Sequence, residues 1–379
     1  MLVPELDHSS IIRNNAEEHA AMADTMKWIG SGDAVTAEAV RRSLLDALGS
    51  EASLPFRGTK PVFRRLSPGC RLCGDGEWSC LFINNLCNAR CFFCPTDQDN
   101  QDEPGTSTLT FPEPGEYADY LERFGFKGAS ISGGEPLLSF EKTLSFITAV
   151  KARLGDGIYL WMYTNGRLLT GEKARLLAHA GLDEIRFNII ATGYDLTPLR
   201  MAAGTIPAVT VEIPAVPEDI GIMKVKLREL ADTGVSFLNL HQIRCTGHNR
   251  ERLAGRGYTF LHGPQIGILE SELTALELMN HAREKGVDLG INYCSLIYRH
   301  RFQSRSSRRR WARLMAKPFE GVTDAGLIRT LRMDADPESV SGIEAVLRSR
   351  GVDPGRWSTG MNSDRITLDA GILGMIDRK

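Results

Sequence analysis

The stretch CLFINNLCNARCFFCP, residues 80–95, joins a short apolar run to three closely spaced cysteines. The run CLFINN has the length and apolar character of a buried β-strand. Cys87, Cys91 and Cys94 then follow with a C-x3-C-x2-C spacing. A structural zinc site needs four ligands, commonly two cysteine pairs separated by a dozen or more residues. Three thiolates on one tight loop instead fit three corners of a [4Fe–4S] cube and leave the fourth iron open to another ligand.

Short apolar runs alternate with amphipathic stretches along most of the chain. The predicted strands are residues 80–85, 128–132, 158–164, 184–190, 208–216 and 236–243, with a seventh at 287–295. Parallel neighbours need long crossover connections, which the intervening amphipathic helices supply. The sequence therefore predicts an α/β fold whose curved parallel sheet forms a partial (β/α)6 TIM-like barrel. Active sites of such folds lie at the carboxyl ends of the strands, where the cysteine loop is expected.

The two ends of the chain are predicted to be smaller units. Residues 1–64 carry helical signals over 9–49 and then a connector rich in Pro, Gly and Arg, so we expect a helical N-terminal extension. Residues 65–300 are expected to form the barrel with its cysteine-rich region. Residues 301–379 are expected to hold a basic segment and a small C-terminal α/β unit with a strand–helix–strand order.

A run of basic residues, 299–317, contains eight Arg or Lys residues and no acidic one. Such a run can bind phosphate, nucleic acid or an anionic substrate. A solvated helix face is the simpler interpretation, because aromatic residues are sparse there and the whole chain has a net charge of -2. We expect no nucleic-acid partner.

The composition is that of an ordinary globular protein, with 42% hydrophobic and 24% charged residues in 379. No apolar run approaches the roughly 20 residues that span a bilayer, and the N-terminus lacks a basic segment followed by an apolar one. We therefore expect a cytoplasmic protein without a membrane partner. Six of the eight cysteines lie between residues 70 and 94. In a reducing compartment this crowding favours metal or cluster ligands over disulfides.

A second motif, GASISGGEP, covers the second predicted strand and the residues that follow it. Adjacent glycines let the backbone approach a ligand closely, as a bound amine or carboxylate requires. On its own the motif is compatible with a simple strand-to-helix turn. Its place after the second strand, beside the cysteine loop after the first, makes a shared site the better interpretation.

With these motifs the chain resembles the radical S-adenosylmethionine (SAM) superfamily. That family has a partial (β/α)6 barrel, a C-x3-C-x2-C loop after the first strand and a GGEP-type motif after the second. The resemblance implies that Cys87, Cys91 and Cys94 bind a [4Fe–4S] cluster whose free iron is chelated by the amino and carboxylate groups of SAM. It also implies that the reduced cluster cleaves SAM to methionine and a 5'-deoxyadenosyl radical, which abstracts hydrogen from a substrate.

The same resemblance implies contacts with SAM. Phe93 matches the aromatic residue whose backbone lies against adenine. The segment that meets the methionine amine corresponds to Ser132, Gly133, Gly134 and Glu135.

Within the superfamily, the chain is most similar to proteins related to pyruvate formate-lyase activating enzyme. YTNG (163–166) resembles the end of their third strand, EIPAVP (212–217) resembles a fifth-strand region, and His241 resembles a sixth-strand histidine near adenine. The candidates for cofactor binding from these later strands are Thr164, Asn165, Asn188 and His241. The chain departs from the pattern at Glu212, where a basic residue is usual, and at Tyr163, where an acid is usual.

Arg186 and Asn188 lie two residues apart on the fourth predicted strand and so face the same side of it. A contact with substrate or SAM and an internal salt bridge both fit an inward-facing pair of this kind.

A second group of cysteines precedes the first. Cys70, Cys73 and Cys80 have a C-x2-C-x6-C spacing, and Cys294 or Cys245 could supply a fourth thiol. An auxiliary Fe–S cluster is the favoured interpretation, with a small zinc site and inert buried thiols as alternatives. Cys245 follows the sixth strand, where a thiol could instead donate hydrogen to a substrate radical, so Cys294 is the preferred ligand.

These observations predict a radical SAM enzyme that uses a [4Fe–4S] cluster, SAM and an auxiliary cluster. It would need a reductant such as flavodoxin or ferredoxin. The expected substrate is a small natural-product intermediate, a peptide or a residue of a protein. The alternative within this class is an activase of a glycyl-radical enzyme. A non-catalytic zinc- or RNA-binding module is the alternative outside it.

Overall fold

The computed structural model describes residues 8–20, 25–100, 102–360 and 364–372. Two compact units follow one another along the chain, Met1–Phe302 and Gln303–Lys379. In the described residues no helix combines the length and the apolar character needed to cross a membrane.

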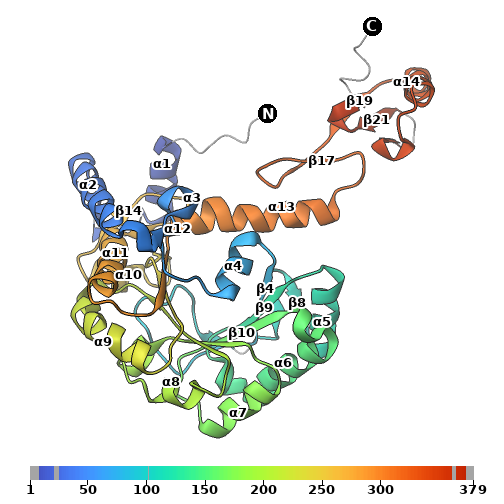
Figure 1. The fold of residues 1–379 in the computed structure, drawn as a ribbon. Coiled ribbons are helices and arrows are strands. Elements are labelled where there is room, and N and C mark those ends of the chain that lie inside the picture. Colours follow the sequence, from blue (N-terminus) through green and yellow to red (C-terminus); the bar gives the residue numbers. More distant parts are fainter. Residues whose placement is uncertain (1–7, 21–24, 101, 361–363, 373–379) are drawn as a thin grey trace. The chain divides into compact units, whose positions relative to one another are not determined.

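The first unit is built on a sheet in which seven neighbouring strands run parallel (Figure 1). In spatial order from one side these are β4 (Trp78–Phe82), β9 (Gly128–Ser132), β10 (Tyr159–Thr164), β11 (Glu184–Phe187), β12 (Ala208–Pro214), β13 (Phe237–His241) and β16 (Gly290–Cys294). All seven overlap the strands predicted from the sequence, so that prediction is confirmed.

Short antiparallel strands extend the sheet at both sides, so the barrel does not close on itself. Beyond β16 lie β3 (Val62–Phe63) and β2 (Ala52–Ser53), and beyond β4 lie β7 (Gly105–Thr106) and β8 (Leu109–Thr110). The sequence analysis did not predict these edge strands. Each is only two residues long, which is too short for an alternating pattern to be recognised.

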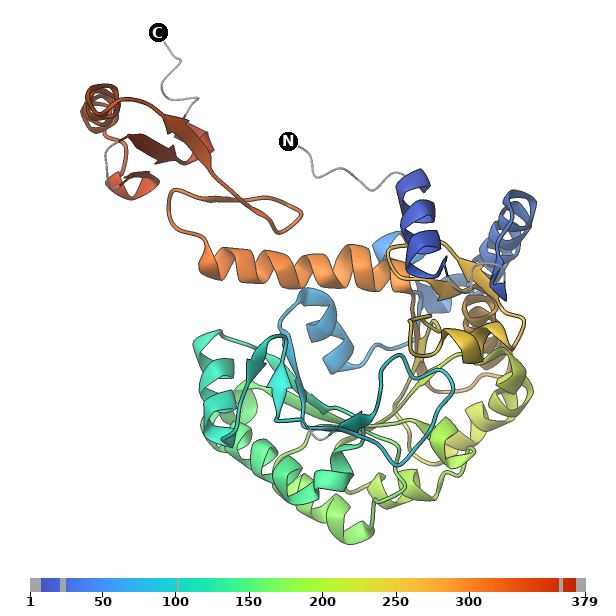
Figure 2. The ribbon, with the colours of Figure 1, turned by 180° about the vertical axis from the view of Figure 1, so that it is seen from behind.

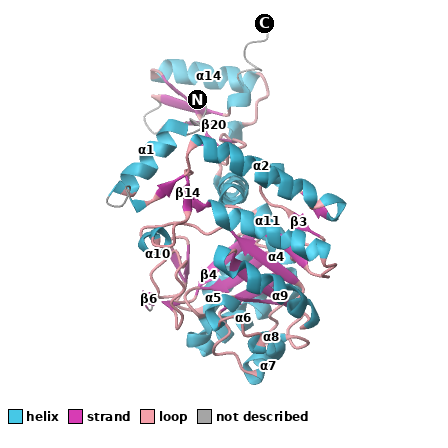
Figure 3. Cartoon of the chain, turned by 90° about the vertical axis from the view of Figure 1, so that its left-hand side faces the viewer, coloured by secondary structure: helices cyan, strands magenta, loops and turns pink. Residues whose placement is uncertain are grey.

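Helices cover the outer face of the sheet, and the strands lie inside them (Figures 2 and 3). They are α5 (Pro114–Arg123), α6 (Phe140–Leu154), α7 (Gly171–His179), α8 (Thr197–Ala202), α9 (Ile220–Asp232) and α11 (Leu269–Glu284). Each buries one face and exposes the other, as Tyr117 of α5 and Phe146 of α6 illustrate. The fold is the predicted partial barrel.

Another helix, α4 (Pro68–Asp75), packs against the side chains of the strands and was not predicted. Its start has ordinary signals, since the Ser67 hydroxyl accepts a hydrogen bond from the Cys70 amide and Pro68 follows. Gly69 has no room for a side chain, because a Cβ there would lie 2.3 Å from Nη2 of Arg186 and 3.2 Å from the Trp161 ring. The helix therefore lies directly against inward-facing residues of β10 and β11.

The N-terminal extension is helical in α1 (His8–Glu18) and α2 (Ser31–Ala47), as predicted. The helical signals over 9–49 do not hold for residues 25–30, which are not α-helical, and residues 21–24 lie outside the described part. Lys27 and Trp28 form β1, which pairs with β14 (Thr259–Leu261), and β15 (Gly267–Ile268) completes that small sheet. The Trp28 ring stacks on His262 with centroids 4.0 Å apart, which favours the extended backbone over a helix.

Small elements connect these parts. They are α3 (Pro55–Gly58), β5 (Asn85–Leu86), β6 (Asp99–Asn100), α10 (Arg250–Ala254) and α12 (Leu296–Tyr298).

The second unit has a core of its own. It contains α13 (Ser304–Met315), the pair β17 (Gly321–Val322) and β18 (Ile328–Arg329), and then β19 (Leu331–Asp334), α14 (Pro337–Ser349), β20 (Trp357–Thr359) and β21 (Arg365–Leu368). The last three strands form an antiparallel sheet in the order β19-β21-β20. Leu347, Trp357 and Ile366 are buried against one another. The predicted strand–helix–strand unit is confirmed, with β20 as an additional strand.

Candidate metal and cofactor site

The first cysteine loop lies at the carboxyl end of β4, where residues from two other strand ends contact it. Asn165 follows β10, and its Nδ2 donates to Sγ of Cys87 at 3.7 Å. Asn188 follows β11, and its Nδ2 donates to Sγ of Cys91 at 3.8 Å. The Ala89 amide donates to Sγ of Cys87 at 3.4 Å. Three N–H groups therefore point at sulfur, which suits thiolates rather than neutral thiols.

The loop brings three thiols close enough to affect one another's ionisation. Burial and, to a lesser extent, the neighbouring Cys87 and Cys94 thiols raise the pKa of Cys91 to about 11, against the Asn188 hydrogen bond. Burial also raises the pKa of Cys87. Three adjacent thiolates need a cationic centre, and an iron–sulfur core supplies one.

No three His, Cys, Asp or Glu side chains among the described residues are placed to hold a single metal ion. A cube spreads its ligands over separate irons, so its sulfur ligands stand farther apart than those of one ion. The donor set of the loop, three thiols with N–H donors around them, fits a [4Fe–4S] cluster better than a closed zinc site.

The two glycines of the GGEP motif lie directly against the backbone of residues 84–86. A Cβ at Gly133, whose φ is +135°, would lie 2.2 Å from the carbonyl oxygen of Asn84, and one at Gly134 would lie 1.9 Å from that of Leu86. The Gly134 amide donates to the Asn84 oxygen at 3.1 Å, and the Glu135 amide donates to the Leu86 oxygen at 2.6 Å. Glycine is required because the segment lies directly on the backbone that leads into Cys87. Contact of Ser132, Gly133 and Gly134 with SAM stays a prediction.

Glu135 is fully buried and joins the ends of two strands. Its carboxylate accepts hydrogen bonds from the Thr164 hydroxyl at 2.7 Å, the Asn165 amide at 2.6 Å and the Leu137 amide at 3.0 Å. Burial raises the pKa of Glu135, although these hydrogen bonds favour its charged form. Glu135 and Thr164 therefore hold Asn165 in place beside Cys87, and a direct contact of either with SAM remains untested.

A segment between β13 and β14 holds the cysteine loop by its backbone, a contact that was not predicted from the sequence. The Thr246 hydroxyl donates to the carbonyl oxygen of Pro95 at 2.8 Å. Nδ2 of the fully buried Asn249 donates to the oxygen of Phe93 at 3.0 Å. Arg252 reaches the oxygen of Cys91 at 3.5 Å. The residues have no motif of their own, so only the three-dimensional structure reveals the contact.

We expect Asn249→Asp to loosen the cysteine loop. The substitution keeps the side-chain shape but removes the Nδ2 donor, and it leaves the carbonyls of Phe93 and Arg244 without this partner. The free energy of unfolding of the apo-protein should fall by about 1–3 kcal/mol. Iron should also be lost faster to a chelator, as followed by absorbance. The exposed Asn14→Ala serves as the control, and an unchanged rate of iron loss in Asn249→Asp would contradict the role given to this contact.

Inward-facing residues of β11, β12 and β13 form a buried network of charges. Arg186 contacts Glu184 at 2.9 Å and Glu212 at 2.7 Å. Glu212 also accepts from Nδ2 of Asn239 at 2.8 Å and lies 2.7 Å from Nε2 of His241. Burial would raise the pKa of Glu212, but Arg186 and His241 outweigh it and lower the pKa. Of the two alternatives for Arg186, the structure has the internal salt bridge. The acid at position 212 is the partner of this arginine.

His241 faces the second cysteine group. Its ring hydrogen-bonds to the Cys294 thiol as well as to Glu212, and the Glu212 carboxylate raises its pKa despite burial. Cys294 is paired in register with His241 across β13 and β16. The His241 ring therefore has Glu212 and Cys294 as partners. Its contact with adenine stays a prediction.

The second cysteine group lies on three elements. Cys70 and Cys73 are one turn apart on α4, Cys80 is on β4, and Cys294 ends β16. Nη1 of Arg186 lies 3.8 Å from Sγ of Cys70. Burial raises the pKa of Cys73 above its usual range, and the Cys70 and Cys294 thiols add to that effect. Cys70, Cys73 and Cys294 are therefore neighbours inside the barrel.

Cys245 lies in an apolar cluster with Ile243, Leu253 and Phe260 and is 4% exposed. Burial raises the pKa of its thiol to about 12. A thiol with a raised pKa stays protonated at neutral pH, which fits both a structural thiol and a hydrogen donor, so the role of Cys245 as a hydrogen donor stays a prediction.

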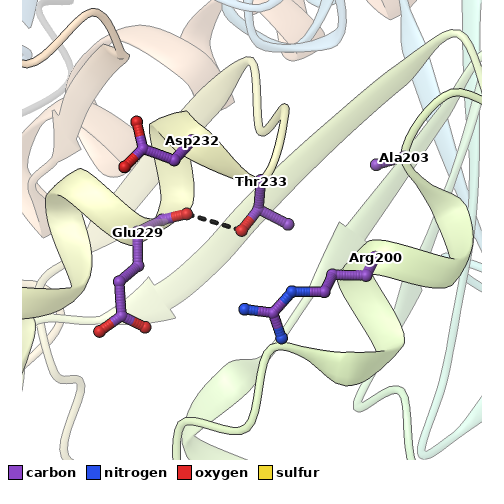
Figure 4. A pocket seen from close by; sticks show the side chains of 5 residues that line it. All are labelled: Arg200, Ala203, Glu229, Asp232 and Thr233. Carbon is purple, nitrogen blue, oxygen red and sulfur yellow. Dashed lines mark hydrogen bonds between the residues drawn. The ribbon is translucent and has the colours of Figure 1, made fainter.

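The surface also has a hollow at the ends of two outer helices. Arg200, Ala203, Glu229, Asp232 and Thr233, from the ends of α8 and α9, line it (Figure 4). The Thr233 hydroxyl donates to the carbonyl oxygen of Glu229 at 2.6 Å, which is an ordinary helix-end hydrogen bond. None of the cysteines lines this hollow, so it is not the candidate site.

Comparison with known proteins agrees with this geometry. A model of the radical SAM superfamily matches residues 81–208. A protein of Methanocaldococcus jannaschii, provisionally named a glycyl-radical enzyme activating enzyme, is 31% identical over 278 residues, which is 70% of this chain and 73% of that protein. A GTP 3',8-cyclase of Rhodopirellula baltica is 34% identical over 160 residues, 41% of this chain and 43% of that enzyme.

A solved structure of methylornithine synthase covers 67% of this chain and 85% of its own, with 13% identity and a TM-score of 0.37. That score is too low to support an argument.

The chain belongs to the radical SAM superfamily. As an enzyme of that family it uses a [4Fe–4S] cluster and SAM, and it requires a reductant and a substrate.

Proposed function

We propose that Cys87, Cys91 and Cys94 hold the [4Fe–4S] cluster at which SAM is reductively cleaved, and that the enzyme abstracts hydrogen from a peptide, a protein or a natural-product intermediate. The observation that carries this proposal is the convergence of Asn165 and Asn188, from two other strand ends, on the sulfurs of Cys87 and Cys91. When bound, the cofactor pair supplies a 5'-deoxyadenosyl radical for hydrogen abstraction.

The chain's own residues would bind and orient this pair. Glu135 fixes the position of Asn165, and Asn249 holds the Phe93 carbonyl. Phe93, Ser132, Gly133 and Gly134 are proposed to line the SAM site, with His241 deeper in the barrel. The electron donor is proposed to be a flavodoxin or ferredoxin, in the cytoplasm.

A second iron–sulfur centre is proposed among Cys70, Cys73, Cys80 and Cys294. Its support is the proximity of three of these thiols on α4 and β16, next to the buried cations Arg186 and Lys60. Buried cations next to thiols suit an anionic cluster.

A role as activase of a glycyl-radical enzyme is the second candidate. The relative of M. jannaschii favours it, since its name states that activity and its similarity extends over most of both chains. The extra cysteines favour a more elaborate reaction on another substrate.

The proposed cleavage predicts that anaerobically purified enzyme, reduced with dithionite, converts SAM to equal amounts of methionine and 5'-deoxyadenosine. Liquid chromatography with mass detection measures both products. A preparation that contains iron and sulfide but forms no 5'-deoxyadenosine would overturn the proposal. With a co-encoded glycyl-radical enzyme present, a glycine-centred radical in the electron paramagnetic resonance (EPR) spectrum would identify the activase role.

A further inference from the structure

Lys60 lies opposite Cys294 on a neighbouring backbone segment. β3 pairs antiparallel with β16, and Val62 faces Asn292 in that register. The Tyr293 amide donates to the Pro61 carbonyl at 3.0 Å, so the two segments stay side by side beyond the strand. Continuing the register by two residues places Lys60 opposite Cys294.

The Lys60 ammonium is buried, with the residue only 3% exposed. Its Nζ donates to Oδ1 of Asn292 at 2.9 Å and lies 4.6 Å from the centroid of the Tyr298 ring. Both partners are neutral. In the described residues no carboxylate lies within ion-pair distance of Nζ. A buried cation without a close anion is costly, so a negative group is expected nearby.

Thiols of the second cysteine group are candidates for that negative group. The Lys60 ammonium interacts electrostatically with Cys294, Cys70 and Cys73, and less strongly with the Glu212 carboxylate, which is itself paired with Arg186 and His241. The His241 ring, which is paired in register with Cys294 across β13 and β16, also hydrogen-bonds to the Cys294 thiol.

The elements that carry these thiols are in direct contact. Tyr298, which lies beside Lys60, also meets α4, because a Cβ at Gly74 would lie 2.7 Å from its hydroxyl oxygen. Gly74 immediately follows Cys73 in the helix. Tyr298 interacts electrostatically with Cys294, Cys73 and Cys70 as well. The three thiols therefore share Lys60 and Tyr298 as neighbours.

Cys80 has hydrogen-bond partners on β9. It pairs in register with Ser130, and its thiol hydrogen-bonds to Ser130 and Ser132. Cys80 shares Arg186 and Glu212 with Cys70 as electrostatic neighbours, but Lys60 is among the main neighbours of Cys70 and not of Cys80. β4 and β16 are the first and last of the seven parallel strands, so Cys80 and Cys294 lie on strands that do not pair with each other.

We propose that the auxiliary iron–sulfur centre is bound by Cys70, Cys73 and Cys294, with Cys80 outside the ligand set and Lys60 as its buried counter-charge. This inference rests on the proposed function, which places a second centre among these cysteines. An oxidised [4Fe–4S] core with three thiolates carries one net negative charge, which the single charge of Lys60 matches. One iron of such a centre takes its fourth ligand from outside the cysteines.

The test uses the full chain with Cys87, Cys91 and Cys94 all replaced by alanine, so that only the auxiliary centre can bind iron. After anaerobic reconstitution it should hold about four irons and four sulfides per chain. Adding Cys70→Ala, Cys73→Ala or Cys294→Ala should reduce the bound iron severalfold, whereas Cys80→Ala should leave it unchanged.

The possible outcomes distinguish a failure of the second centre itself from a failure of the proposed ligand set. No iron in the triple variant overturns the second centre itself. Iron that survives Cys294→Ala but is lost in Cys80→Ala overturns the ligand set and leaves the second centre standing. Circular dichroism of each apo-variant shows whether iron loss follows from unfolding.

The counter-charge is tested by the midpoint potential of the auxiliary centre in an EPR-monitored redox titration. Lys60→Met should retain iron and shift the midpoint to a more negative value, because reduction adds negative charge that the ammonium stabilises. Lys60→Arg should restore the midpoint toward that of the parent, and Lys142→Met on the outer helix α6 should not change it. An unshifted midpoint in Lys60→Met would overturn the role of Lys60.

Discussion

Cys91→Ala is expected to abolish the reductive cleavage of SAM, with 5'-deoxyadenosine falling by at least about three orders of magnitude. The thiol of Cys91 is central to its loop, because it interacts with both Cys87 and Cys94 and accepts a hydrogen bond from Asn188. Without it only two thiols remain for the first cluster. The measurement is the yield of 5'-deoxyadenosine from dithionite-reduced protein.

Cys70→Ala is the matched control for this substitution. Cys70 lies on α4 beside Arg186, apart from the loop of the first cluster. Its loss should leave some cleavage of SAM uncoupled from substrate turnover. If both variants retained full cleavage, the assignment of the first cluster to Cys87, Cys91 and Cys94 would be wrong.

Gly134→Ala is expected to disrupt the approach to the first cluster. The added Cβ would lie 1.9 Å from the Leu86 carbonyl oxygen and 2.9 Å from the Cys87 nitrogen, and both are backbone atoms that no side-chain rotation can move away. The free energy of unfolding should fall by about 3 kcal/mol, as expected for severe overpacking. Denaturant titration of the apo-protein measures this change, and iron bound after reconstitution should fall with it.

Gly221→Ala in α9 is the control for the glycine substitution, since a Cβ there meets nothing within 4 Å. A helical alanine should be neutral or slightly stabilising. If Gly134→Ala retained the stability and iron content of the parent, the close approach of the GGEP segment to the cysteine loop would not exist in solution.

The barrel and the position of the first cysteine loop could be predicted from the sequence alone. Each parallel strand is a run of apolar residues bounded by turn signals, and the C-x3-C-x2-C spacing is local to one loop. The helix that carries Cys70 and Cys73 was missed, because it is only eight residues long and its packing depends on the space beside Trp161 left by Gly69.

The roles of Lys60 and Asn249 were not predictable, because their partners are distant in the sequence. Lys60 and its partner Asn292 are 232 residues apart in the sequence, and Asn249 and its partner Phe93 are 156 residues apart. The acid at position 212 looked like a departure from the family pattern in sequence. The structure explains it as the partner of Arg186 and His241.

The most direct test of the account is the content of iron, sulfide and zinc in protein purified without oxygen. Two cubane clusters per chain predict about eight irons and eight acid-labile sulfides, with no stoichiometric zinc. About four irons and four sulfides per chain would be consistent with the first cluster alone and would contradict the second cluster. Zinc without sulfide would contradict the central claim, because thiols that hold only zinc cannot carry out reductive cleavage of SAM.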